Sequence, residues 1–249
     1  MSLERTGAGD PLRTIELLWP DPEPQRPRRG PVPRLGPDEI SGAAVRLADA
    51  DGLGGVTLRK LAEQLGLSSP AALYTYVPGK AELVDLMVDA AFGGFVLDVG
   101  SMPPRIPDRI SAIADANRAL HDRHRWLVEV SVDRPPLGPG QLRKYDLELA
   151  ALDGLGLSDH EMDLALGLVL AFVRWAAASA LNAASAAEEA AWWAAAGPAL
   201  GRRVAPGRFP FAARIGSAAG ERQGRAHDPD LAYRFGLERI IAGIEALKR

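Results

Sequence analysis

Apolar residues recur at intervals of three and four positions along most of this chain from residue 37 onward. In residues 37–51, for example, Ile40, Ala44 and Leu47 fall on one side of a helix that repeats every 3.6 residues. The same repeat predicts further helices over residues 57–66, 80–96, 108–130, 141–153, 158–187 and from residue 229 onward. No segment alternates between apolar and polar residues as a half-buried strand would. The pattern therefore predicts an all-α fold.

The ends of these predicted helices carry residues that favour a start or a stop. Gly66 can end a helix in the left-handed conformation, and Ser158 with Glu161 has the spacing of a capping box. Asp228, followed by proline, is a typical start for the last helix. Residues 197–227 are rich in Gly and Arg, and are expected to form a loop with short helical pieces.

Composition narrows the class of protein. The 249 residues contain no cysteine, which excludes disulfides and thiolate metal sites and suits the cytoplasm. Residues 164–187 are strongly apolar, but Arg174 interrupts them and alanine dominates their second half, so a buried helix of a soluble protein is expected. The formal net charge of −3 gives no overall attraction to nucleic acid, so DNA binding would need a local patch.

The first 33 residues are rich in proline and show little periodicity, which indicates a flexible arm. Its basic residues near the first long helix are Arg26, Arg28, Arg29 and Arg34. Such an arm can enter the minor groove of DNA, where narrow A/T-rich stretches concentrate negative potential. A solvated tail with no role in binding is the alternative.

Residues 61–80, "LAEQLGLSSPAALYTYVPGK", have the spacing of a helix-turn-helix. A tight turn at Gly66 separates two short helices, the second of which starts near Ser69 and Pro70. Small residues at the start of that helix would allow close approach to base edges, and tyrosine or threonine hydroxyls can contact phosphates. An ordinary helical turn inside a bundle has the same spacing and remains the alternative.

A longer stretch, "GVTLRKLAEQLGLSSPAALYTYVPGKAELVDLMVD", resembles the DNA-binding domain of the tetracycline-repressor (TetR) family of bacterial transcription regulators. "HRWLVEVSVDRPPLGPGQLRKYDLELAALDGLGLSD" and "AYRFGLERIIAGIEAL" resemble the ligand-binding and dimerising domain of that family's tetracycline-repressor branch. The resemblance implies three parts: an arm over residues 1–33, a three-helix DNA-binding domain over 34–96, and an α-helical ligand-binding and dimerisation domain over 97–249. It also implies a homodimeric repressor of a palindromic operator, released by a small apolar or amphipathic effector, in a branch that often controls antibiotic exporters.

Carried over position by position, the resemblance implies a set of DNA contacts. Between Gly66 and Tyr74 this chain is one residue longer than the usual family pattern. The implied contacts are Thr57, Arg59, Ser69, Pro70, Tyr74, Thr75, Tyr76 and Lys80, to which the arm would add Arg34.

The apolar helix that begins after Ser158 carries two stripes. The bulky stripe, Leu168, Phe172, Trp175, Ser179 and Asn182, suits a ligand pocket, with Arg174 or Asn182 holding a polar group of the ligand. The stripe of small residues, Val169, Val173, Ala176 and Ala180, suits close packing against a second subunit, together with the last helix. Alternatively, both stripes fill one core.

No catalytic constellation emerges from the sequence. His121 and His124 are three residues apart and could share a metal ion, but no third ligand accompanies them, so neither a metal nor a cofactor is expected. The alternative function is that of an all-α small-molecule-binding protein or enzyme that has lost DNA binding.

Overall fold

The computed structural model describes residues 4–20, 35–182, 186–204, 207–223 and 228–247. Its α-helices are α1 (Pro11–Leu18), α2 (Pro37–Asp51), α3 (Leu58–Gln64), α4 (Lys80–Gly93), α5 (Ile106–Arg123), α6 (Pro139–Leu152), α7 (Asp159–Asn182), α8 (Ala186–Gly201), α9 (Pro210–Gln223) and α10 (Pro229–Glu245). Short 3-10 helices are η1 (Leu53–Gly55), η2 (Pro70–Thr75), η3 (Val99–Ser101) and η4 (Arg125–Glu129). The strands within the described residues are β1 (Glu4–Arg5) and β2 (Val130–Ser131), which pair in parallel. The prediction of an all-α fold is confirmed, apart from this one short pairing.

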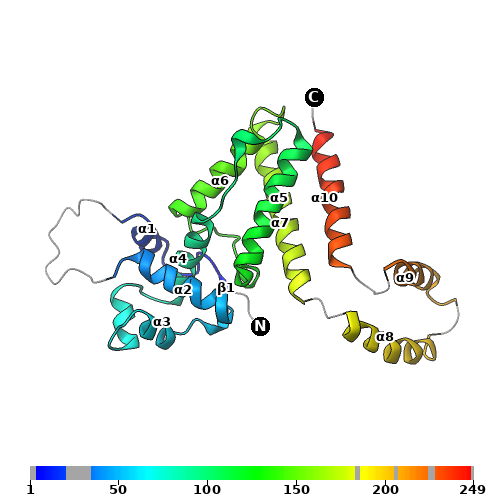
Figure 1. Cartoon of the computed structure of the whole chain (residues 1–249), viewed down its shortest axis with the longest axis horizontal. Coiled ribbons are helices and arrows are strands. Elements are labelled where there is room, and N and C mark those ends of the chain that lie inside the picture. Colours follow the sequence, from blue (N-terminus) through cyan, green and yellow to red (C-terminus); the bar gives the residue numbers. More distant parts are fainter. Residues whose placement is uncertain (1–3, 21–34, 183–185, 205–206, 224–227, 248–249) are drawn as a thin grey trace.

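A small domain made of α2, α3 and η2 lies at one end of the molecule (Figure 1). Ile40, Leu61 and Leu73 are buried in its centre, one from each of these helices. The backbone N–H of Gly36 donates to the Glu39 carboxylate, which closes the first turn of α2. These contacts fix the angle between α3 and η2 and hold the outer surface of η2 toward solvent.

Helix α4 leads from the small domain into the rest of the chain and packs against both α2 and α6. Leu83, Val84 and Val88 are buried along it, together with the carboxylates of Asp85 and Asp89. Asp89 accepts from the backbone N–H groups of Gly140 and Gln141, so it caps the N-terminus of α6. The two domains are therefore joined by a continuous helix that is fixed at both ends.

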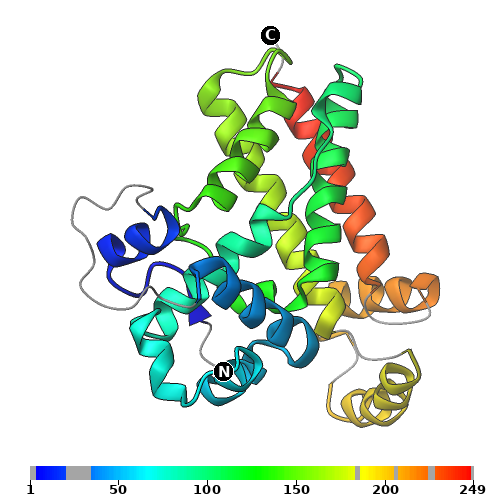
Figure 2. The ribbon, with the colours of Figure 1, turned by 60° about the vertical axis from the view of Figure 1, so that its left-hand side comes forward.

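The larger domain is a bundle of α5, α6, α7 and α10 (Figure 2). Trp126 of η4 is only 1% exposed and closes the bundle beside the small domain. Its ring N–H donates to Asp49 of α2 at 2.8 Å. Helices α8 and α9 lie to one side of the bundle in Figures 1 and 2.

Several predicted boundaries are confirmed. The Ser158 hydroxyl and Glu161 carboxylate form the expected capping box at the start of α7. Asp228 accepts from the N–H groups of Asp230 and Leu231 and caps α10. Gly66 adopts a φ of +65° at the end of α3, which a residue with a side chain would reach only under strain.

Three predictions about elements are wrong. The helix predicted over residues 108–130 ends at Arg123, because η4 and β2 follow it. Residues 197–227 are not mainly loop, since α8 ends at Gly201 and α9 spans most of the rest. The arm predicted over residues 1–33 is not flexible throughout: residues 4–19 form β1 and α1, with Thr6, Thr14 and Leu18 buried.

Candidate DNA-binding surface and effector site

The turn between α3 and η2 is built from backbone hydrogen bonds. The N–H of Leu67 donates to the carbonyl of Ala62 at 2.9 Å, and that of Gly66 donates to Glu63 at 3.2 Å. Such paired bonds end a helix and redirect the chain within a few residues. The segment that follows, η2, is a 3-10 helix of six residues and not the α-helix that the sequence indicated.

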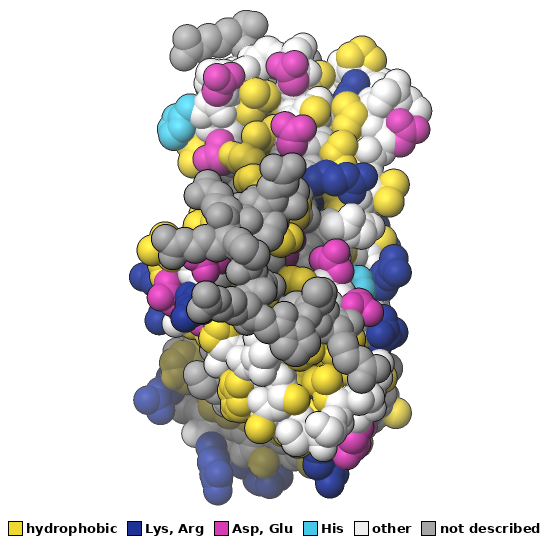
Figure 3. Space-filling view, turned by 90° about the vertical axis from the view of Figure 1, so that its left-hand side faces the viewer, with side chains coloured by type: hydrophobic (Ala, Val, Ile, Leu, Met, Phe, Trp, Pro, Cys, Tyr) yellow, Lys and Arg dark blue, Asp and Glu magenta, His cyan; other side chains and the backbone are white. Residues whose placement is uncertain are grey.

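Most of the residues implied as DNA contacts are exposed to solvent. Tyr74 has 56% of its surface exposed. The members that are solvent-exposed are Thr57, Arg59, Ser69, Pro70, Tyr74, Thr75 and Lys80. In Figure 3, Lys and Arg side chains lie at the lower end of the molecule, the end at which α3, α8 and α9 lie in Figure 1. Arg59 and Lys80 are the exposed basic members of the implied set.

The residues implied as DNA contacts differ in the interactions that their side chains make within the chain. Arg59 lies 3.8 Å from Glu63 one turn along α3, in a highly exposed pair that DNA could readily displace. Thr57 uses its hydroxyl to accept from the Lys60 N–H, so it caps α3. Tyr76 is half-buried against the domain core, so most of its ring serves packing. Lys80 pairs with Glu4 of β1 at 2.6 Å. Arg34, like Arg26, Arg28 and Arg29, lies outside the described residues.

In the larger domain, aromatic rings gather between α7 and α10. Phe172 stacks on Tyr233 with ring centroids 5.7 Å apart, and Trp175 lies 5.7 Å from Phe172. The Arg118 guanidinium covers the Tyr233 ring at 4.8 Å. Such surfaces favour a flat, partly apolar ligand.

Three buried polar atoms of the larger domain have no hydrogen-bond partner among the described residues: His121 Nδ1, Arg174 Nε and the Tyr233 hydroxyl. Burial, together with the positive charges of Lys144 and Arg174, lowers the pKa of His121 to about 4. His121 is therefore neutral at pH 7. Unpartnered buried polar groups destabilise a protein unless something else satisfies them, so this cluster fits a place for a polar ligand group.

Arg174 is also tied to the protein. Its Nη2 donates to the carbonyl of Val130 at 2.8 Å and to that of Val128 at 3.2 Å. Nearby, Lys144 and Glu148 form a buried ion pair at 2.6 Å, and Asn117 donates to the same carboxylate oxygen. Of the predicted pocket residues, Phe172 and Trp175 contact each other, whereas Arg174 donates to Val128 and Val130. The side chain of Asn182 lies outside what the structure describes.

The assignment of the two α7 stripes is wrong in part. Val169 and Val173 of the small-residue stripe are buried in this chain's own bundle, at 2% and 1% exposure. Leu168 and Trp175 of the bulky stripe are each 51% exposed. The most apolar stretch of α7 passes the length and composition test for a membrane span, yet only 28% of it is buried within the chain. Helix α7 therefore presents a bulky apolar face outward.

The outward face of α7 meets α10 in an apolar groove of about 470 Å³. Its lining residues are Glu161, Leu164, Ala165, Leu168, Arg239, Ile240, Gly243, Ile244 and Leu247.

His121 and His124 do not come together as a metal site. Helix α5 ends between them, and the His124 ring turns to Asp49 of α2, with Nδ1 2.8 Å from the carboxylate. In the described part of the chain, no group of three His, Asp or Glu residues is placed to hold a metal ion.

A helix-turn-helix domain joined to an α-helical bundle defines a class of DNA-binding regulators, and comparison with known proteins agrees. Residues 40–87 match the bacterial regulatory proteins of the tetR family, and residues 103–248 match the tetracyclin repressor-like C-terminal domain. The HTH-type transcriptional repressor DrrR1 of Streptomyces coeruleorubidus is 37% identical over 99% of this chain and 90% of its own length. The class C tetracycline repressor of Escherichia coli is 26% identical over 86% of this chain and 93% of its own.

Comparison with solved structures indicates the same family. ActR of Streptomyces coelicolor in complex with actinorhodin superposes with a TM-score of 0.68 at 27% identity, covering 86% of this chain and 98% of ActR. The chain belongs to the tetR family, and it is a DNA-binding transcriptional repressor of the helix-turn-helix type.

Proposed function

We propose that the protein is a homodimeric repressor that binds an inverted-repeat operator and leaves it when a small effector binds in the larger domain. The observation that carries the DNA-binding half is the exposed surface of Arg59, Tyr74 and Lys80 around η2. The proposal places the protein in the cytoplasm and gives it no catalytic role.

The proposed dimer uses the outward faces of α7 and α10. Leu164 and Leu168 are 58% and 51% exposed, and Phe235 of α10 is 62% exposed. An apolar face of this size on two neighbouring helices suits packing against the same two helices of a second copy. A two-fold dimer would present two identical recognition segments, which must lie about 34–36 Å apart to reach successive major grooves.

The proposed effector site lies among α5, α7 and α10, where Phe172, Trp175 and Tyr233 meet. His121, Arg174 and Tyr233 each keep a buried polar atom free there. We expect a flat, partly aromatic effector that carries oxygen atoms able to accept from the Arg174 Nε–H. The complex of ActR with actinorhodin supports a small-molecule effector.

Arg59 provides the sharpest test of the DNA-binding surface. Arg59→Ala should weaken operator binding by about 1–3 kcal/mol if the guanidinium reads a guanine, and selectivity should be lost at one position per half-site. Glu63→Ala removes the partner of Arg59 on α3 and is the matched control. The operator can be recovered by sequencing fragments of sheared genomic DNA that the purified protein binds, and affinities follow from titration against single-base variants. Equal weakening on every sequence would mean that Arg59 contacts phosphate only.

The alternative, an α-helical binding protein that has lost DNA binding, makes the opposite prediction. Such a protein would retain no specific fragment from genomic DNA, and footprinting would show no paired protection. Protection of two inverted half-sites would exclude it.

A further inference from the structure

Residues 4–19, here called the strap, lie before both family matches, which begin at residues 40 and 103. The strap consists of β1 and α1, and it touches both domains of the protein. Its contacts therefore bear on how the DNA-binding domain sits relative to the effector domain.

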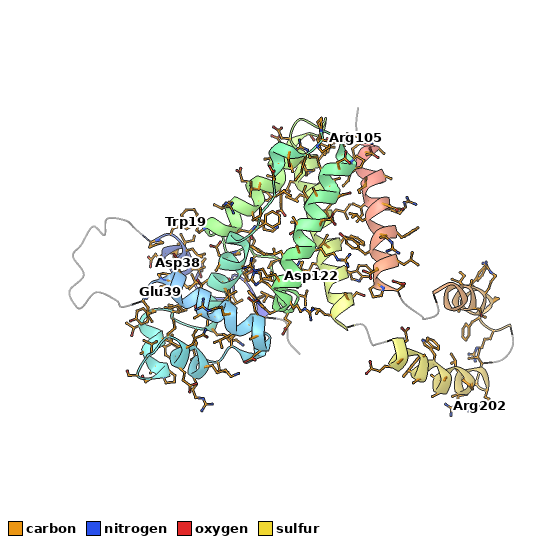
Figure 4. The ribbon with its side chains drawn as sticks, viewed as in Figure 1. Trp19, Asp38, Glu39, Arg105, Asp122 and Arg202 are labelled. Atoms are coloured by element: carbon orange, nitrogen blue, oxygen red, sulfur yellow. The ribbon has the colours of Figure 1, made fainter. Side chains whose placement is uncertain are left out.

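At both of its ends, the strap is bonded to the effector domain. β1 pairs with β2, and the Thr6 N–H donates to the Ser131 carbonyl at 3.0 Å. The Thr6 hydroxyl donates to the carbonyl of Arg134 at 2.6 Å and lies 3.2 Å from that of Ser131. Trp19, labelled in Figure 4, donates its ring N–H to the Leu137 carbonyl at 2.9 Å just before α6.

Along its length, the strap is bonded to the N-terminal half of α4. The Gly7 N–H donates to Asp85 at 2.8 Å, and the Thr14 hydroxyl donates to the other oxygen of the same carboxylate at 3.3 Å. Asp85 has no exposed surface, so these bonds replace its lost hydration. The Asp10 N–H donates to Glu82 one turn closer to the recognition segment. Glu4 then pairs with Lys80, the first residue of α4.

Strand β2, with which the strap pairs, is also contacted by a residue assigned to the proposed effector site. Arg174 of α7 donates to the carbonyl of Val130, the β2 residue that pairs with Glu4. Arg174 lies two residues from Phe172, which stacks on Tyr233. A connection thus runs from Arg174 through its hydrogen bond to Val130, the pairing of β2 with β1, and the Glu4–Lys80 ion pair.

We propose that the strap is a positioning element of the DNA-binding site: it fixes the N-terminal end of α4, with Lys80, to strand β2, and Arg174 transmits the state of the effector site to that strand. This inference rests on the proposed function for what the effector site does, but the mechanical link is a property of one chain. The strap is thus a connection between the domains in addition to helix α4 and to the contacts of Trp126 and His124 with Asp49 of α2.

The mechanical link can be measured without effector or DNA. Because the chain has no native cysteine, cysteines at Gln64 of α3 and Leu142 of α6, both exposed, can carry a spin-label pair within one chain. An excess of unlabelled protein keeps the distances within one chain even if the protein dimerises. Thr6→Val removes both hydroxyl hydrogen bonds with little change in shape. Arg174→Lys removes the Nη2 contacts with Val128 of η4 and Val130 of β2.

Both variants should broaden the distribution of label distances at least twofold, and combining them should add little, because they break one link. Leu12→Ala, which trims an exposed side chain from the outer face of α1, is the control and should leave the distribution unchanged. Unchanged distributions in Thr6→Val and Arg174→Lys, with circular dichroism showing folded protein, would overturn the proposal.

The contact of the strap with Lys80 is tested by comparing the DNA binding of Glu4→Gln with that of Glu16→Gln. Both remove one negative charge from the strap, but only the first frees Lys80, since Glu16 is an exposed residue of α1. On a non-specific duplex of about 30 base pairs, Glu4→Gln should steepen the log–log salt dependence of binding by about 0.9, the value for one added phosphate contact. Glu16→Gln should run parallel to the wild type.

Equal salt-dependence slopes for the two variants would show that the strap does not control the contact of Lys80 with DNA. If the wild type binds no duplex at all, the proposed function fails, and the label distances still decide whether the strap positions the domain. The two failures are therefore distinguishable.

Discussion

At the scale of single residues, some buried polar groups have hydrogen-bond partners within the described chain and others do not. Asp85, Asp89 and Glu148 each accept from two donors, which offsets the cost of burying a carboxylate. Burial nevertheless raises the pKa values of Asp85 and Asp89 above the usual range, and their hydrogen bonds only reduce that rise. His121 lacks such compensation at Nδ1 within the described chain. His121, which lacks a partner at Nδ1, is assigned to the proposed effector site. The carboxylates that have hydrogen-bond partners lie where helices meet.

The lowered pKa of His121 predicts a pH dependence of stability. The folded state keeps this imidazole neutral down to about pH 4, whereas the unfolded chain protonates it near its ordinary value of 6.5. The stability that it contributes is therefore complete above pH 6.5 and is lost as pH falls toward 4, with a slope of up to about 1.4 kcal/mol per pH unit. Urea unfolding across this range should show a smaller slope in His121→Gln than in the wild type.

His160→Gln is the matched control, because His160 is exposed in the first turn of α7. It should leave the slope close to that of the wild type. Identical slopes for all three proteins would mean that His121 is accessible to protons in the folded state.

Residue-level prediction from sequence succeeded where a local motif fixes the position of a side chain. The turn at Gly66 and the cap at Thr57 are local, and they place Arg59 and Tyr74 on the exposed surface that the sequence indicated. His121 was considered only as a metal ligand, because its spacing from His124 is visible in sequence and its distance from Arg174 is not. Tyr233 was not singled out at all, since its place opposite Phe172 depends on how α10 returns to α7.

At the scale of elements, the contact between α4 and α6 decides how the two domains are joined. Gly140 in the first turn of α6 lies so close to α4 that a Cβ there would overlap the carbonyl oxygen of Asp89 and come within 2.8 Å of the Gly93 nitrogen. Backbone atoms in the middle of a helix cannot move aside cheaply. The absence of a side chain at residue 140 is therefore what allows Asp89 to cap α6.

Gly140→Ala should push α6 away from α4 and destabilise the protein by about 1–3 kcal/mol, the usual cost of overpacking. Operator affinity should fall as well, because α4 carries Lys80. Denaturant unfolding and operator titration measure the two effects. Gly197→Ala in α8 is the control, since nothing lies within 4 Å of a Cβ placed there. A Gly140→Ala protein as stable as the control would show that the helices separate freely.

Element prediction failed where non-local contacts decide the outcome. The pairing of β1 with β2 joins segments about 125 residues apart, and two-residue strands leave no periodic signal in sequence. Proline-rich composition indicated a flexible arm, yet Thr14 and Leu18 are buried against the body of the protein. The recognition segment was expected as an α-helix, but η2 spans only six residues and ends in the turn that precedes α4.

At the scale of the whole molecule, the exposed apolar face of α7 and α10 is the surface proposed for the dimer. Periodicity correctly indicated that α7 has two apolar stripes, but it did not show which of them faces the chain's own core. Leu168 and Trp175 are exposed and the two valines are inside, so the expected assignment is wrong in part. The fold and family could be predicted from the sequence, whereas the orientation of one helix about its axis could not.

Leu168→Lys should prevent dimerisation, because it places a charge in the apolar groove beside Arg239. Leu142→Lys, at a leucine of α6 with 44% exposure, is the control and should remain dimeric. Sedimentation at micromolar concentration gives the mass, and operator titration should show loss of binding to the full inverted repeat. A dimeric Leu168→Lys protein would place the interface elsewhere.

The pairing of the strap with β2 also has a consequence for the order of synthesis. The ribosome makes residues 4–19 first, but the strand that they join is not made until residue 131. The whole of the DNA-binding domain, through α4, is therefore synthesised while the strap still has no strand to pair with. A nascent chain can complete its recognition segment before Glu4 is anchored beside Lys80, and the last step in assembling this DNA-binding surface belongs to the first residues of the chain.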